Sequence, residues 1–120
     1  MNIQEKTIVN KIRIISVREA AQDLYDIGIL FNDYFTIEDF KKFYKIAMKK
    51  EDNLKDFLYI YGTLKYATEA IKNNKNDLLL KEDTNFNQNL EKLNETFEKL
   101  ADNLIEINNN LYKNSNKLKL

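Results

Sequence analysis

The chain has 120 residues, of which 19 are basic and 19 acidic, and it contains no Cys, His or Pro. This length suits one domain, and the balance of charge excludes the strongly basic surface typical of nucleic-acid-binding proteins. The absence of Cys excludes disulfides and thiolate metal sites. With only two Gly and no Pro, the chain has too few turn residues for a strand-rich fold. We therefore predict a single all-α domain over residues 1–120.

The first segment, residues 5–31, is predicted to form one helix. Residues 5–15 are rich in β-branched side chains and could form a strand, but no second strand candidate follows with which they could pair. Apolar residues instead recur at spacings of three and four, which predicts a helix. Ser16 is an alternative N-cap in case residues 5–15 are irregular, and Gly28 indicates either close approach of another helix or the beginning of the end of this helix. The apolar stripe comprises Ile14, Val17, Ala21, Leu24, Gly28 and Phe31.

Two further helices are predicted after a turn at residues 32–35. Thr36 is a good N-cap, and the acidic first turn and basic last turn of residues 37–50 suit the helix dipole. Residues 53–73 are apolar on more than one side, so we expect this helix to be central and to contact two or more neighbours. The three leucines at 78–80 are predicted to fold back as a turn of helix against the end of the bundle.

The longest predicted helix covers residues 85–113, with residues 113–120 as a frayed tail. Its apolar residues are spaced alternately by four and three, an unbroken heptad seam that another helix must cover. The positions beside the seam are uncharged, whereas self-pairing coiled coils usually place Glu and Lys there. We therefore predict a four-helix, mostly antiparallel bundle rather than an isolated coiled coil. The seam comprises Phe86, Leu90, Leu93, Phe97, Leu100, Leu104, Ile107 and Leu111.

Catalytic chemistry finds little support in this sequence. Without His, the chain lacks the commonest general base and metal ligand, and neither a phosphate-binding Gly-rich loop nor a nucleophile motif is present. We expect no catalytic, cofactor-binding or metal-binding residues and no enzyme activity. No apolar run reaches the ~18 residues of a membrane span, and no signal peptide is recognisable, so we expect a cytoplasmic protein without a membrane partner. The abundance of Lys, Asn and Ile is typical of AT-rich coding, as in a low-GC bacterium or its phages and plasmids.

Two groups of residues are candidates for binding. Tyr34, Phe35, Phe43 and Ile46 lie beside the predicted buried face of the second helix, so we expect residues 34–46 to form an aromatic contact surface for a protein partner or a second copy of the chain. The alternative is that these side chains are packed inside. Lysines at i, i+4 and i+8 of the same helix form either a phosphate-binding stripe or, as we favour, a solvated outer face. These lysines are Lys41, Lys45 and Lys49.

Taken together, these patterns predict a small non-enzymatic protein that acts by binding another protein, as an inhibitor, immunity protein or accessory factor. The alternative is a structural or scaffold subunit that assembles with itself, as a homodimer or larger oligomer, through the seam at 86–111. A weaker alternative is a nucleic-acid binder that uses the lysine stripe. The solution mass distinguishes the first two hypotheses.

Overall fold

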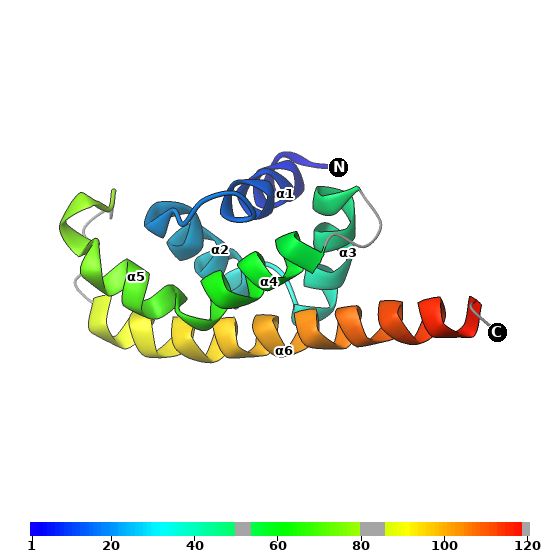
Figure 1. Ribbon diagram of the computed structural model, residues 1–120. Coiled ribbons are helices and arrows are strands. Elements are labelled where there is room, and N and C mark those ends of the chain that lie inside the picture. Colours follow the sequence, from blue (N-terminus) through cyan, green and yellow to red (C-terminus); the bar gives the residue numbers. More distant parts are fainter. Residues whose placement is uncertain (50–53, 80–85, 119–120) are drawn as a thin grey trace.

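The computed structural model describes residues 1–49, 54–79 and 86–118, and the side chains of these residues except at 54 and 111–118. The described residues contain α-helices, one short 3₁₀ turn and no strand (Figure 1), which confirms the predicted all-α class. The predicted number of helices was wrong, because two of the four predicted helices are each interrupted. The elements are α1 (Ile3–Ile15), α2 (Ala21–Asp33), α3 (Ile37–Met48), α4 (Leu54–Lys65), α5 (Ala67–Asn73), η1 (Lys75–Asp77) and α6 (Phe86–Leu118).

The first predicted helix is interrupted after Ile15. Residues 5–15 are helical as predicted, and α1 begins at a capping box in which the amide of Glu5 donates to the Asn2 side chain at 2.8 Å. Ser16 is the C-cap of α1 rather than an N-cap, and its hydroxyl donates to the Arg13 carbonyl at 2.6 Å. The break lets α1 fold back against α2 and pack against α3 as well. Val17, predicted to lie in the apolar stripe, is 74% exposed in the resulting loop.

The second predicted helix is present with the predicted N-cap. The amide of Asp39 donates to the Thr36 hydroxyl at 3.3 Å, and the amide of Thr36 donates to the Asp39 carboxylate at 2.9 Å. Together these bonds satisfy two amides at the start of α3. The helix ends at Met48, because Lys49 adopts a left-handed conformation with φ of 40°. α3 lies between α1 and α6.

The third predicted helix bends at Tyr66 and so becomes α4 and α5. Hydrogen bonding continues through the bend, since the amide of Tyr66 donates to the Gly62 carbonyl at 3.1 Å and that of Ala70 donates to the Tyr66 carbonyl at 3.2 Å. After α5 comes the short 3₁₀ turn η1. The turn of helix predicted at 78–80 was wrong for its described residues, because Leu78 has an extended backbone and ends η1. Leu78 packs against the core, whereas Leu79 is 86% exposed; residue 80 lies outside the described residues.

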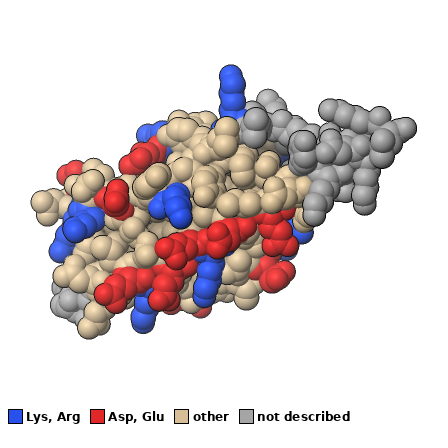
Figure 2. Space-filling view, turned by 60° about the horizontal axis from the view of Figure 1, so that its bottom comes forward, with Lys and Arg blue, Asp and Glu red and all other residues tan. Residues whose placement is uncertain are grey.

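Helix α6 extends along one whole side of the molecule and contacts α2, α3, α4 and α5 (Figure 1). The other helices cover one face of it. Of the predicted seam, Leu90 is half-buried, and the side chain at 111 lies outside the described part. The remaining seam residues are buried: Phe86, Leu93, Phe97, Leu100, Leu104 and Ile107. The opposite face of α6 is solvated, and Figure 2, which looks onto this side of the molecule, shows acidic side chains in rows across it.

Gly28 permits the closest approach between α2 and α6. A Cβ atom on this residue would lie 2.3 Å from Cδ2 of Leu93 and 3.0 Å from the Phe97 ring. Carbon atoms in good contact are about 3.5–4.0 Å apart, so no larger residue fits here without moving its neighbours. The close helix approach predicted at Gly28 is therefore confirmed.

Candidate functional site

The predicted contact surface at residues 34–46 is largely inside the molecule. Phe43 is only 2% exposed, and its ring centroid lies 5.0 Å from that of Phe35 and 6.3 Å from that of Phe31. Phe35 and Ile46 are half-buried, and only Tyr34, at 64%, is well exposed. The prediction that Phe43 stands at an exposed edge was wrong. The physical reason is that Phe31 at the end of α2 and Phe35 in the following turn pack against the Phe43 ring, while α1, separated from α2 by the break after Ile15, packs on α3 as well.

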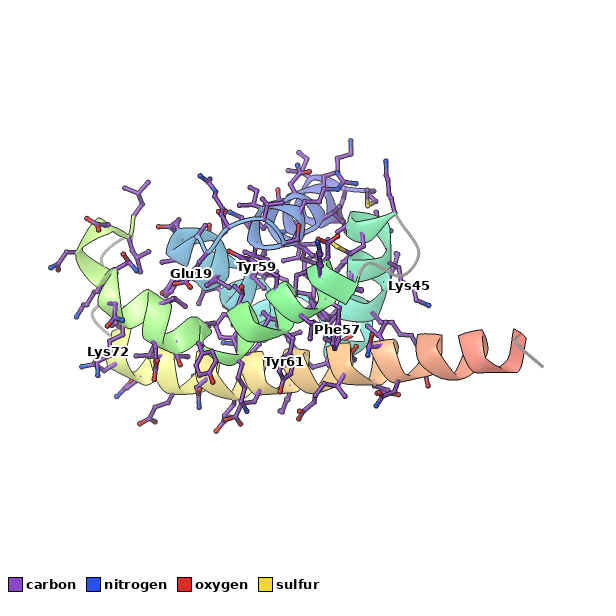
Figure 3. The ribbon with its side chains drawn as sticks, viewed as in Figure 1. Glu19, Lys45, Phe57, Tyr59, Tyr61 and Lys72 are labelled. Carbon is purple, nitrogen blue, oxygen red and sulfur yellow. The ribbon has the colours of Figure 1, made fainter. Side chains whose placement is uncertain are left out.

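The predicted lysine stripe lies on α3 with its members in different surroundings. Lys45 and Lys49 are exposed, with Lys45 on the outer side of the helix (Figure 3), whereas Lys41 is half-buried. The neighbouring Lys42 lies 3.6 Å from the Glu5 carboxylate of α1, an exposed contact worth little in water. Lys49 also ends the helix. The exposed lysines are therefore typical of a solvated outer face, and Lys49 is the C-cap of α3.

The best-defined electrostatic contact holds α1 to α2. The ammonium of Lys11 lies 3.0 Å from the Asp23 carboxylate and 2.8 Å from that of Asp26, with its side chain only 18% exposed. Burial disfavours the charged lysine, but hydrogen bonds and negative charge from both carboxylates outweigh it and raise the pKa of Lys11 above its ordinary value. On the other side of α1, Nε of Arg13 donates to the Ala47 carbonyl at 3.2 Å. These contacts fix α1 between α2 and α3.

Three of the exposed large apolar side chains in the described part of the chain lie on α4 or directly after it. One side of this helix is packed, with Ile60 fully buried and Leu64 1% exposed. The other side carries Leu58, Tyr59 and Tyr66, which are 55%, 41% and 63% exposed. Within it lies Gly62, where a Cβ would meet no atom within 4 Å. We call this surface the α4 outer face and define it as Leu58, Tyr59, Gly62, Lys65 and Tyr66.

Aromatic side chains continue around α4 beyond the outer face. Phe57 and Tyr61 are half-buried and stack with ring centroids 6.2 Å apart and an interplanar angle of 17°. Figure 3 shows these two rings on the side of α4 that faces α6, and Tyr59 on the opposite side. The helix therefore presents aromatic groups on both flanks. Aromatic residues are enriched in the centres of protein interfaces.

A shallow groove of about 650 Å³ lies between α5 and α6. Its lining is mostly polar, with Glu69 and Lys72 from α5, and Leu90, Glu91 and Glu95 from α6. Within the described residues, no group of three or more acidic side chains is arranged to hold a metal ion, and no helix is long and apolar enough to cross a membrane.

Comparison with protein-family models, with curated proteins and with solved structures found no match for this chain. The candidate site therefore depends on geometry alone.

The α4 outer face was only partly foreseen from the sequence. Tyr59 and Tyr66 belong to an excess of aromatics that simple core packing does not explain. Residues 53–73 are apolar on several sides, and this pattern was interpreted as the mark of a central helix. The described part of α4 instead packs chiefly against α6 and α5, so the remaining apolar side is open to solvent. The useful signal was the position of Gly62 among large apolar residues.

Proposed function

We propose that this chain is a small non-enzymatic, cytoplasmic protein that acts by binding another protein, in the manner of an inhibitor, immunity protein or accessory factor. In this proposal the contact surface is the α4 outer face rather than residues 34–46. The observation that carries it is the exposure of three large side chains close together in the sequence, Leu58 and Tyr59 on α4 and Tyr66 at the bend that follows α4. Contiguous exposed apolar surface on a protein this small is typical of an interaction site.

The composition of the face supports a protein partner. Tyrosine offers a large rigid ring with a polar tip, which loses little conformational entropy on binding and can still meet water when free. Lys65 is the only charged residue of the α4 outer face, so burial of the face desolvates few charges. A protein surface with an apolar centre and a carboxylate near Lys65 would match it.

The second hypothesis, self-assembly through the heptad seam of α6, is less well supported. We interpret α6 as the central, heptad-patterned helix of an antiparallel bundle whose other members already cover the seam. Leu93, Phe97 and Leu100 are at most 1% exposed within a single chain. Assembly through these residues would require the bundle to open. The lysine stripe likewise gives little support to nucleic-acid binding, since Lys41 is half-buried.

Affinity capture from the host cell tests the proposal. The bait is the full chain, compared with Leu58→Asp on the α4 outer face and with Val17→Asp in the loop after α1. Both positions carry exposed aliphatic side chains, 55% and 74% respectively, so both variants should keep the helical circular dichroism of the parent. We expect a captured protein to be retained by Val17→Asp and lost by Leu58→Asp. Equal retention by both variants would rule out this face, and failure of the parent chain to capture any protein would refute the proposal.

A further inference from the structure

On the α4 outer face, large side chains lie on both sides of Gly62 along the helix. Tyr66 is the residue that follows α4, and because its amide donates to the Gly62 carbonyl at 3.1 Å, the helical hydrogen bonding of α4 extends to Tyr66. Residues three and four positions away on a helix are its surface neighbours. Leu58 and Tyr59 therefore flank Gly62 on its N-terminal side, and Lys65 and Tyr66 flank it on its C-terminal side. Bulky groups thus surround a position that has no side chain.

This arrangement matches a copy of itself. When two such helices cross in antiparallel orientation at Gly62, each residue before the glycine meets the residue equally far after it on the other copy. Leu58 then faces Tyr66, an apolar contact, and Tyr59 faces Lys65, a cation over an aromatic ring. Complementarity of a patch to itself is the requirement of a two-fold symmetric interface. A different protein could bind the face without such matching of residues before and after Gly62.

Gly62 also provides the space that such a crossing needs. A Cβ here would meet no atom of its own chain within 4 Å, in contrast to Gly28, whose missing side chain is already used by α6. Glycine lets another backbone approach closely, and it weakens a helix interior when nothing uses the space. A second α4 at this position would make use of it.

We propose that the α4 outer face is the interface of a homodimer in which two α4 helices cross at Gly62. This inference rests on the proposed function in taking the α4 outer face as the binding surface, and it names a second copy of the chain, rather than a different protein, as what binds there. It replaces the predicted seam at 86–111 as the route to self-association.

The test is the mass of the chain in solution, measured by sedimentation equilibrium from low micromolar to submillimolar concentration. We expect the parent chain to approach twice its monomer mass. Tyr66→Asp places a charge in the interface and should weaken the dimer by about tenfold or more. The matched control is Tyr34→Asp, because Tyr34 and Tyr66 are 64% and 63% exposed but only Tyr66 belongs to the face. This control should dimerise like the parent.

Gly62→Gln separates loss of the dimer from loss of the fold. Glutamine is a better helix former than glycine, and its Cβ has open space in the single chain. The variant should therefore be at least as resistant to urea as the parent at low concentration, yet fail to dimerise because the side chain keeps the helices apart. This pair of results supports the inference.

Three results would overturn the inference: a parent chain that stays monomeric throughout, Gly62→Gln and Tyr66→Asp variants that still dimerise, or a Tyr34→Asp variant that dissociates. A monomeric parent would leave the proposed function standing, provided that capture of a different protein still depends on Leu58. Loss of that capture together with an intact dimer would refute the proposed function and leave the homodimer inference standing.

Discussion

The two glycines of the chain provide a matched pair of substitutions that tests the packing of α2 on α6. Both lie inside helices, Gly28 in α2 and Gly62 in α4. Replacing glycine by alanine in a helix interior gains about 0.5–1 kcal/mol, because the unfolded chain loses conformational freedom and helix propensity improves. The surroundings decide whether this gain is kept. Only at Gly28 does the new methyl group collide with another helix.

The magnitude at Gly28 follows from the contact distances. The alanine Cβ would lie 2.3 Å from Cδ2 of Leu93 and 3.0 Å from the Phe97 ring. Leu93 and Phe97 are 0% and 1% exposed, so neither side chain can swing into solvent. Overpacking of this kind costs about 1–3 kcal/mol. After subtraction of the gain in helix propensity, Gly28→Ala should destabilise the chain by up to about 2.5 kcal/mol, whereas Gly62→Ala should stabilise it by about 0.5–1 kcal/mol.

Urea unfolding followed by circular dichroism measures both effects, at concentrations where the chain is monomeric. A double variant identifies the collision directly. Leu93→Ala alone should cost about 2–5 kcal/mol, but combined with Gly28→Ala its cost should fall, because the added methyl fills part of the cavity, with a coupling of about 0.5–3 kcal/mol. If Gly28→Ala stabilises the chain as much as Gly62→Ala, or if the double variant is additive, α2 and α6 do not meet at Gly28.

Further predictions concern the core and the ion pairs. Phe97→Ala should cost about 3–5 kcal/mol and Glu98→Ala less than about 0.5 kcal/mol. Equal decreases in the thermal unfolding temperature would mean that the buried face of α6 is assigned wrongly. Phe43→Asp should abolish the helical circular dichroism, because it buries a charge among aromatic rings. A variant that keeps its helical signal would instead support the prediction that Phe43 is exposed. Lys11→Met should cost about 1–3 kcal/mol by leaving two carboxylates unpaired, against almost nothing for exposed Lys45→Met. Since the folded pKa of Lys11 is raised, its contribution is complete below its unfolded pKa and is lost as the pH rises through the folded value. The parent should therefore weaken above about pH 10 more steeply than Lys11→Met in urea titrations.

The start of α3 and the buried face of α6 were predictable because their signals are local. A capping residue acts on amides two or three positions away, so Thr36 and Asp39 could be paired from the sequence alone. The seam of α6 is also a property of one helix, and its buried residues follow from its period. Helix interruptions were missed at residues 16–20 and at Tyr66, where neither Gly nor Pro marks the break. Such turns are set by contacts between helices that are distant in sequence.

One missed turn determined which of the predicted surface residues were wrong. A first helix continued through residue 31 would leave the side of α3 on which α1 packs uncovered. In the folded chain Phe43 is core, packed against Phe31 and Phe35, and the aromatic excess near residues 34–46 is explained by packing. The same explanation does not extend to α4, where Leu58, Tyr59 and Tyr66 remain uncovered in the folded chain. An apolar pattern on several sides of a helix therefore has two interpretations, burial within the chain or burial against another molecule. Only the tertiary structure distinguishes them, and in this protein it excludes burial within the chain for Leu58 and Tyr59 of α4.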